Sequence, residues 1–189
     1  MATWSTYGVK PKSLAYKILG NKIVKAIAHD MGTEYRVVWK PPSTYEGPTW
    51  DGTTLRNSSH PEIYGIHDVA HLMEAPKCRR HLPEFGLGTD PGGSYPYEYD
   101  DYLTIDLKRA EREEWRVCDL HWALAAYVGG LSHASLIEDH LNMNESPTVT
   151  VEAINRMQKY VDRGWLPDNF LERVLKVQAK ELKRDSYGG

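Results

Sequence analysis

His67 and His71 lie four residues apart in the stretch His-Asp-Val-Ala-His. Residues at this spacing project from the same face of a helix, so the two imidazoles are presented side by side. The His-Glu-x-x-His proteins use the same spacing to bind zinc. Asp68 occupies the position of their glutamate, and its shorter side chain reaches less far, so we treat it as a candidate catalytic group only. The spacing predicts a pair of metal ligands.

A metal site requires at least one further ligand. Four side chains of metal-ligating types recur at helical spacing later in the chain: Glu111, Glu114, Cys118 and His121. We expect either Glu111 or Glu114 to be the third ligand, with Glu114 also a candidate catalytic residue, and the sequence leaves the choice open. Glu74, three residues after His71, is an additional carboxylate. The alternative is that these glutamates belong to a solvated helix face.

Two histidines and one carboxylate suit more than one metal chemistry. With open coordination positions they suit iron(II) and the activation of oxygen. The same ligands suit zinc(II) with an activated water. We expect a divalent metal cofactor, with iron(II) favoured and zinc(II) as the alternative, and an iron-dependent oxygenase or hydroxylase as the function. A second metal ion held by the extra carboxylates is also compatible with the pattern.

Two other functions remain open. One is a metal-dependent hydrolase, either zinc peptidase-like or an HD phosphohydrolase, since His67-Asp68 is itself an HD dipeptide. An HD enzyme would need an upstream histidine, for which His29 or His60 is available, and the distant Asp119. The other is a non-enzymatic helical binding protein. For an enzyme we expect a small molecule or a protein side chain as substrate.

The elements that must position these residues are mostly helices. Apolar residues recur at spacings of three and four, and Pro and Gly mark the boundaries. The predicted helices cover 11–31, 60–75, 106–128, 131–142, 149–163 and 167–184, and one short strand covers 35–39. The predicted fold class is therefore mainly α, a single domain over 1–189 with a small β element. Its core covers about 11–130, and residues 131–189 form a C-terminal helical part.

Two long irregular segments, 41–60 and 77–102, flank the helix that carries the histidine pair. Functional loops are commonly held by a rigid scaffold, so we expect both segments to form walls of a pocket around the metal site. Arg79 and Arg80 lie at the start of the second segment. Arginine recognises carboxylates and phosphates in a bidentate manner, which makes this pair a candidate for substrate binding. The alternative is that both are solvated.

Composition narrows the remaining classes. The net charge is −3, with no basic stripe that would indicate nucleic-acid binding. The two cysteines, Cys78 and Cys118, argue against a disulfide framework and for a reducing compartment. No apolar run reaches the length of a membrane span, and the N-terminus lacks the apolar core of a signal peptide. We expect a soluble cytoplasmic protein, and the oligomeric state stays open.

Several motifs follow one another between about residues 60 and 130. His67 to His71 are followed by Arg79-Arg80, Glu84-Phe85-Gly86, Asp90-Pro91-Gly92, the Glu111 and Glu114 pair, and Leu120-His121-Trp122-Ala123. This order resembles the elongation factor P hydroxylase family. The resemblance implies an iron-dependent hydroxylase acting on a lysine-derived side chain of a translation factor, with His67, His71 and one of the two glutamates as ligands. Asp68 departs from the family pattern, and residues 1–59 and 131–189 show no match.

Overall fold

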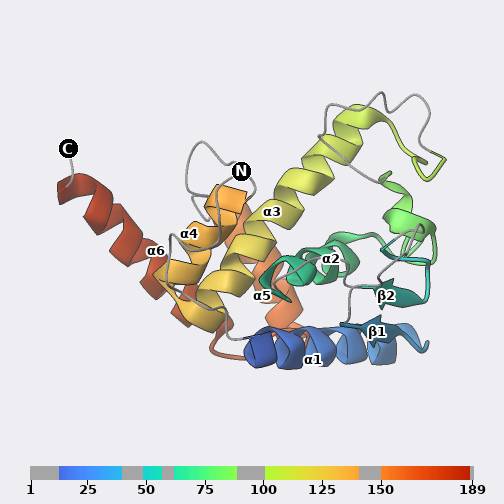
Figure 1. Cartoon of the computed structure of the whole chain (residues 1–189), viewed down its shortest axis with the longest axis horizontal. Helices are drawn as coiled ribbons and strands as arrows, with labels where there is room; N and C mark the ends of the chain where they lie inside the picture. Colours follow the sequence, from blue (N-terminus) through green and yellow to red (C-terminus); the bar gives the residue numbers. More distant parts are fainter. Residues whose placement is uncertain (1–12, 40–48, 57–61, 89–100, 141–149, 188–189) are drawn as a thin grey trace.

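The computed structural model describes residues 13–39, 49–56, 62–88, 101–140 and 150–187. Within them the chain is mainly helical with a small β element, as predicted, and this element is a two-stranded sheet (Figure 1). The helices are α1 (Ser13–Met31), α2 (Glu62–Glu74), α3 (Leu107–Gly129), α4 (Leu131–His140), α5 (Val151–Asp162) and α6 (Phe170–Tyr187). Each of them overlaps a helix that the sequence predicts.

The long helix α3 is the centre of the fold. It packs against α2, α4, α5 and α6, while α1 covers the other side of α2. Asp106 caps its N-terminus by accepting a hydrogen bond from the Arg109 amide, and Gly130, with a φ of 68°, ends it. From Val117 to Ala126 every residue except Asp119 is buried, whereas the first turns are largely exposed. The C-terminal half of α3 therefore belongs to the core and the N-terminal half crosses toward the surface.

Helix α2 lies between α1 and α3. From Gly65 to Met73 every residue is buried except His67 and Asp68, which are partly exposed. Apolar side chains surround this helix because it packs on both sides, as is typical of a core helix. Between Gly65 and Met73, solvent therefore reaches α2 at His67 and Asp68.

The small sheet consists of β1 (Arg36–Val38) and β2 (Thr54–Arg56). The two strands pair in parallel, with Val37 opposite Leu55. The sequence predicts β1 but places β2 inside the irregular segment 41–60, so that part of the prediction is wrong. Three residues are too few to show a strand period, and only the buried Leu55 ties this strand to the core. The remaining residues of 41–60 that were expected as a pocket wall lie mostly outside the described ranges.

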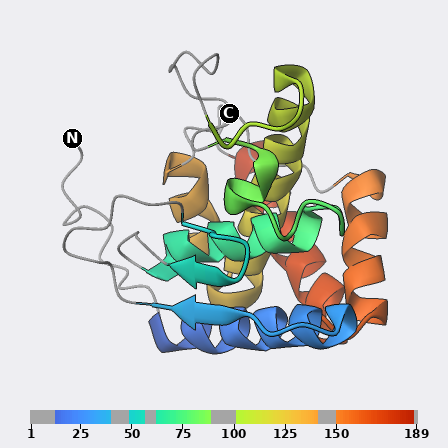
Figure 2. The same ribbon diagram turned by 90° about the vertical axis from the view of Figure 1, so that its right-hand side faces the viewer.

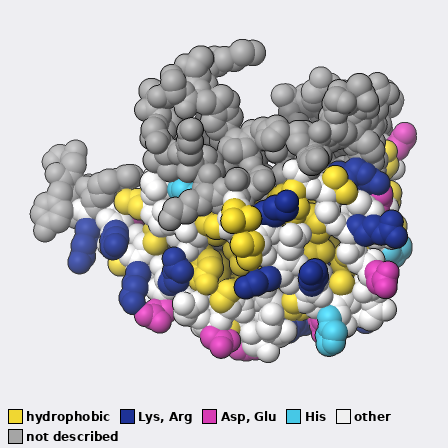
Figure 3. Space-filling view, turned by 60° about the horizontal axis from the view of Figure 1, so that its bottom comes forward, with side chains coloured by type: hydrophobic (Ala, Val, Ile, Leu, Met, Phe, Trp, Pro, Cys, Tyr) yellow, Lys and Arg dark blue, Asp and Glu magenta, His cyan; other side chains and the backbone are white. Residues whose placement is uncertain are grey.

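The surface is not uniformly acidic although the net charge is −3. The face on the side of α1 carries Lys and Arg side chains around an area of hydrophobic side chains (Figure 3). Leu14 and Ile18 of α1 are among the exposed hydrophobic residues. Among the described helices, none combines the length and the apolar character needed to cross a membrane.

Candidate metal centre

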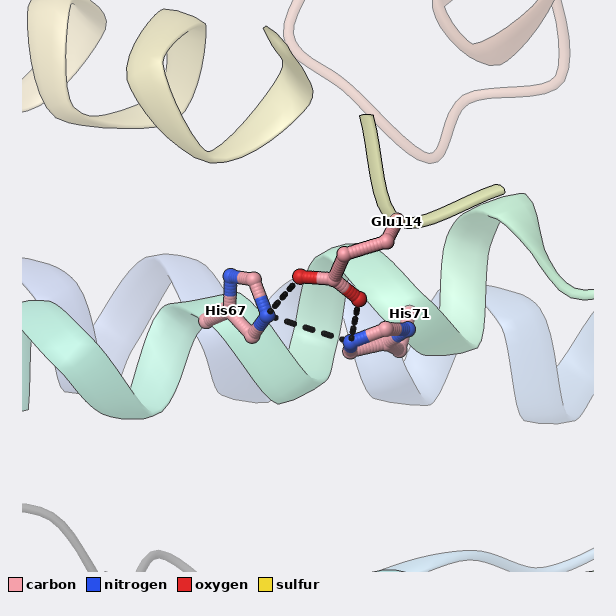
Figure 4. Close-up of side chains that lie close together, drawn as sticks. All are labelled: His67, His71 and Glu114. Carbon is pink, nitrogen blue, oxygen red and sulfur yellow. Dashed lines mark hydrogen bonds and ion pairs between the residues drawn. The ribbon is translucent and has the colours of Figure 1, made fainter. Parts of the chain in front are cut away.

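His67 and His71 of α2 and Glu114 of α3 converge on one point (Figure 4). The two Nε2 atoms lie 3.1 Å apart. His67 Nε2 lies 3.1 Å from Glu114 Oε1, and His71 Nε2 lies 3.2 Å from Glu114 Oε2. The helical spacing predicted for the two histidines is therefore present, and the crossing of α2 and α3 supplies the carboxylate.

These separations fit a bound metal ion. Ligands at about 2.0–2.2 Å from a metal and at a right angle to one another lie roughly 3 Å apart. Glu114 Oε2 is buried, and no aligned hydrogen bond reaches it from the described residues, so it retains accepting capacity. Three converging donors of nitrogen and oxygen type can thus hold a divalent ion, and no fourth His, Cys, Asp or Glu of the described residues joins them.

The charges at the centre favour an ionised carboxylate. Burial by itself would raise the pKa of Glu114, but the contacts with His71 and His67 hold it well below its ordinary value. Asp68 behaves in the opposite way, because burial raises its pKa to about 7 and the carboxylates of Glu84 and Glu114 act in the same direction against His67. The pKa values of the two acidic side chains at the site are therefore shifted in opposite directions, that of Glu114 downward and that of Asp68 upward.

Two further residues of α3 support the ligands from behind. His121 is fully buried, and its Nδ1 lies 3.2 Å from Nδ1 of His67. The Cys118 thiol donates to Glu114 Oε1 over 3.6 Å. Ligand histidines commonly form such a second hydrogen bond, which fixes the tautomer and the ring orientation. Of the four residues predicted at helical spacing on this helix, Glu114 is thus the candidate ligand, Cys118 and His121 contact the candidate ligands, and Glu111 is exposed.

A left-handed turn borders His71. Glu84, Phe85 and Gly86 have successive φ values of 45°, 56° and 70°, which is unfavourable for the two residues that have side chains. Phe85 is stacked between His71, at 5.6 Å, and Trp50, at 5.4 Å between ring centroids. The sequence shows no sign of this turn, since neither Glu84 nor Phe85 is a residue type that favours positive φ.

Arg79 holds this turn against α3. Its Nη1 donates to the Phe85 carbonyl over 2.9 Å, and its Nη2 pairs with Glu113, the residue next to Glu114. Arg79 is only 6% exposed. Arg79 thus ties the turn to α3, and the substrate-binding role predicted for it from the sequence stays a prediction. Arg80 is equally buried and contacts backbone carbonyls of α2, away from the three ligands.

The other predicted site residues are placed elsewhere. Glu111 is exposed and lies outside the converging group, so of the two alternatives the structure brings Glu114 to the histidines. Glu74 pairs with Arg156 of α5 at 3.3 Å, and Asp119 pairs with the same arginine at 3.4 Å. Neither carboxylate joins the three ligands, because α5 supplies a cation that engages both.

Among the described side chains, which do not include that of His140, the remaining histidines do not extend the centre. His29 and His81 are exposed, and His133 is buried with its Nδ1 2.6 Å from the Tyr16 hydroxyl. His60 lies outside the described residues. An HD-type arrangement would need Asp119 with His67 and Asp68, and Asp119 is engaged by Arg156 instead.

Comparison with known proteins adds no relative: no protein-family model, curated protein or solved structure matches the chain. The assignment of the site therefore depends on its geometry and on the residues themselves.

Proposed function

We propose that the protein is a metal-dependent enzyme with a two-histidine, one-carboxylate centre, and that it acts as an iron(II)-dependent oxygenase or hydroxylase. The observation that carries the proposal is the convergence of His67, His71 and Glu114 with separations of 3.1–3.2 Å. Structural zinc sites have four protein ligands, whereas three ligands leave positions for water, oxygen or substrate. Two imidazoles and a carboxylate are the ligand set of non-heme iron(II) oxygenases.

Each residue has a distinct task in this proposal. His67, His71 and Glu114 would hold the ion, which when bound supplies a site for oxygen and for one-electron chemistry. His121 keeps the tautomer of His67 that leaves Nε2 available. Asp68 follows His67 in α2, and burial raises its pKa to about 7, so it can hold or release a proton at its carboxyl oxygen. The order of motifs that resembles the elongation factor P hydroxylases makes a lysine-derived side chain the first substrate to test.

A metal-dependent hydrolase is the second candidate, and the Asp68 carboxyl favours it. A general base works best when its pKa lies near the working pH. With zinc(II) in the same three ligands, Asp68 is placed next to a ligand and can take a proton from an activated water. The HD phosphohydrolase version is less well supported, because Asp119 is held by Arg156.

The free cysteines bear on the compartment. Cys78 is exposed and Cys118 is buried, and neither forms a disulfide. Exposed free thiols persist in reducing compartments, which supports our proposal of a cytoplasmic protein.

Metal-dependent turnover separates the two candidates. We expect the chain loaded with iron(II) under anaerobic conditions to consume oxygen when lysine-bearing peptides are added. The Glu114→Gln variant should lose this activity and the Glu111→Gln variant, altered one turn away on the exposed face of α3, should keep it. Activity with zinc(II) in an oxygen-independent hydrolysis, and none with iron(II), would replace the oxygenase by the hydrolase.

A further inference from the structure

A cavity of about 540 Å³ lies where the C-terminal ends of α1 and α2 meet α5. Figure 2 shows both helix ends reaching α5 on the right-hand side of that view. The cavity lies beyond the metal ligands along α2, and none of His67, His71 and Glu114 lines it. Its volume falls in the range of about 300–1,000 Å³ that is usual for small-molecule sites.

The lining of this cavity is mainly cationic. Lys77, Arg80, Arg156, Lys159 and Arg163 line it, against Asp30 and Glu74 as the acidic residues. Glu74 is already engaged by Arg156 at 3.3 Å and by a hydrogen bond with Tyr160. The positive charge of the lining is consequently only partly balanced by its own carboxylates, although the whole chain has a net charge of −3.

The neighbouring Arg79 and Arg80 differ in whether a carboxylate balances their positive charge. Arg79 and Arg80 are both 6% exposed. Arg79 has Glu113 as an ion-pair partner, whereas no carboxylate of the described residues lies within ion-pairing distance of Arg80. Buried arginines are normally paired, because an uncompensated charge is costly to remove from water. Arg80 is therefore a buried cation without a direct ion pair among the described residues, and Asp30 of the cavity lining acts on it only at longer range.

The hydrogen bonds of Arg80 also indicate that the guanidinium can bind an anion. Its Nε and Nη2 donate to the carbonyls of Leu72 and Met73 at 2.9 and 3.1 Å. Its Nη1 donates to the sulfur of Met31 at 3.3 Å, and a thioether is a weak acceptor. A guanidinium has five N–H donors, so donors remain for an oxyanion in the cavity.

Trp165 holds two of the cations in place. The guanidinium of Arg80 lies 4.9 Å from its ring centroid and that of Arg163 lies 5.1 Å from it. The indole is 2% exposed and is stacked on Tyr160 of α5. Two positive groups against one buried ring repel each other, and a shared anion would relieve this repulsion.

Helix dipoles act against an anion here, since α1 and α2 both direct their C-termini toward the cavity. Several of the carbonyls at these ends are, however, already engaged in hydrogen bonds. Arg80 covers Leu72 and Met73, while the amides of Gly32 and Thr33 cap His29 and Ala28 at 3.1 and 3.0 Å. The five cationic side chains of the lining, against two carboxylates, favour an anion in spite of the dipoles.

We propose that this cavity binds a small organic oxyanion, a molecule bearing a phosphate or carboxylate group. Arg80 is the buried contact, and Lys77, Lys159 and Arg163 complete the recognition of the anion. The proposal does not depend on the metal centre, because the two sites have no residue in common. It also gives Arg80 the anion-binding role that the sequence suggested for the arginine pair, at a different place in the fold.

Titration calorimetry of the full chain at constant ionic strength tests this proposal, with inorganic phosphate and succinate as the probes. We expect saturable binding at one site per chain for at least one of them, and the probe that binds identifies the chemical class. The double variant Lys159→Gln/Arg163→Gln should bind at least about tenfold more weakly, the loss of one charge-assisted contact. The control Lys176→Gln/Lys180→Gln removes two charges from exposed positions of α6 and should bind like the unaltered chain.

Two further variants make the outcome decisive. Arg80→Met should abolish binding, with circular dichroism as the check on folding, and the double variant stands in if Arg80→Met unfolds. His67→Ala should bind the anion normally, which separates this site from the metal centre. The proposal is overturned if neither probe binds saturably, or if the double variant and the α6 control bind equally well.

Discussion

Two regions along α2 differ in the sign of the charge that they leave unbalanced. Around His67 and His71, nitrogen and carboxylate donors converge within 3.1–3.2 Å and call for a cation. At the C-terminal end of the helix, the cavity lined by Arg80 carries five cationic side chains against two carboxylates, which favours an anion. A helix buried on most sides thus places two polar sites close together, and the contrast lies in which neighbour packs on it: α3 brings Glu114 to the first site, and α5 brings Arg156 to the second.

The comparison also separates structural from functional buried charge. Arg79 and Glu113 form a complete pair that ties the left-handed turn to α3. Among the described residues, Arg80 has no ion-pair partner, and no fourth His, Cys, Asp or Glu joins His67, His71 and Glu114. Incomplete buried polar groups are costly unless a ligand satisfies them, so they mark the places where ligands are expected.

The largest effect, on the free energy of unfolding, is expected at the ion pair between Arg79 and Glu113. Glu113→Gln leaves the buried Arg79 guanidinium without a carboxylate, which should lower the free energy of unfolding by about 3–5 kcal/mol. Urea denaturation measures this change. Glu111→Gln, on the exposed face of the same helix, should change it by less than about 0.5 kcal/mol. Equal effects of the two substitutions would show that the Arg79 pair is not a special support.

The next largest effect, on metal affinity, is expected at His121, which contacts the candidate ligand His67. His121→Phe preserves the approximate volume of a fully buried ring but removes the partner of His67 Nδ1. We expect metal affinity to fall by about 10–100-fold while the stoichiometry stays at one ion, because the loss of such an outer hydrogen bond weakens a site without removing a ligand. Competition with a chromophoric chelator measures the affinity. An unchanged affinity would mean that His121 only fills space.

Glu74 tests whether the two regions are independent. Glu74→Gln removes the charge that pairs with Arg156 and should lower the free energy of unfolding by about 1–3 kcal/mol. Metal stoichiometry and affinity should stay the same, since Glu74 is not one of the converging ligands. Loss of metal from this variant would instead support a larger centre that includes Glu74, such as a two-metal centre, and the two regions would then form one site.

The smallest effect is expected away from both regions, at the turn before β2. The Asp51 carboxylate accepts hydrogen bonds from the amides of Thr53 and Thr54 and from the guanidinium of Arg56. Burial by itself would raise the pKa of Asp51, but these hydrogen bonds lower it from 3.8 to about 2. The folded state therefore binds this proton less readily than the unfolded state, so the stabilisation is present above about pH 4 and is lost as the pH falls toward 2.

Asp51→Asn should accordingly destabilise the protein by about 1 kcal/mol at pH 7, and the difference should disappear near pH 2. Denaturation curves at the two pH values measure it. Metal and anion binding at pH 7 should not change. A difference that persists unchanged at low pH would contradict the role assigned to the ionised carboxylate.

The sequence predicts the helices well because their apolar periodicity is strong and Pro and Gly mark most ends. It also predicts that His67 and His71 lie side by side on one face of a helix, since a spacing of four within one helix needs no tertiary information. The choice between Glu111 and Glu114 depends on how α3 crosses α2, which no local pattern contains. The positive φ values at Glu84 and Phe85 and the engagement of Arg79 by Glu113 arise from long-range packing and were equally out of reach.

The most direct test of the central claim is the metal content of the chain purified without chelators or metal-affinity steps, followed by titration with iron(II), cobalt(II) and zinc(II). We predict one ion per chain in a saturable site. His71→Ala and Glu114→Gln should each weaken binding by about 2.5–4 kcal/mol, an equal share of the total typical of a four-ligand zinc site. Glu111→Gln should bind as the unaltered chain does. A chain that binds no divalent ion, or a Glu114→Gln variant that binds as tightly as Glu111→Gln, would contradict the account.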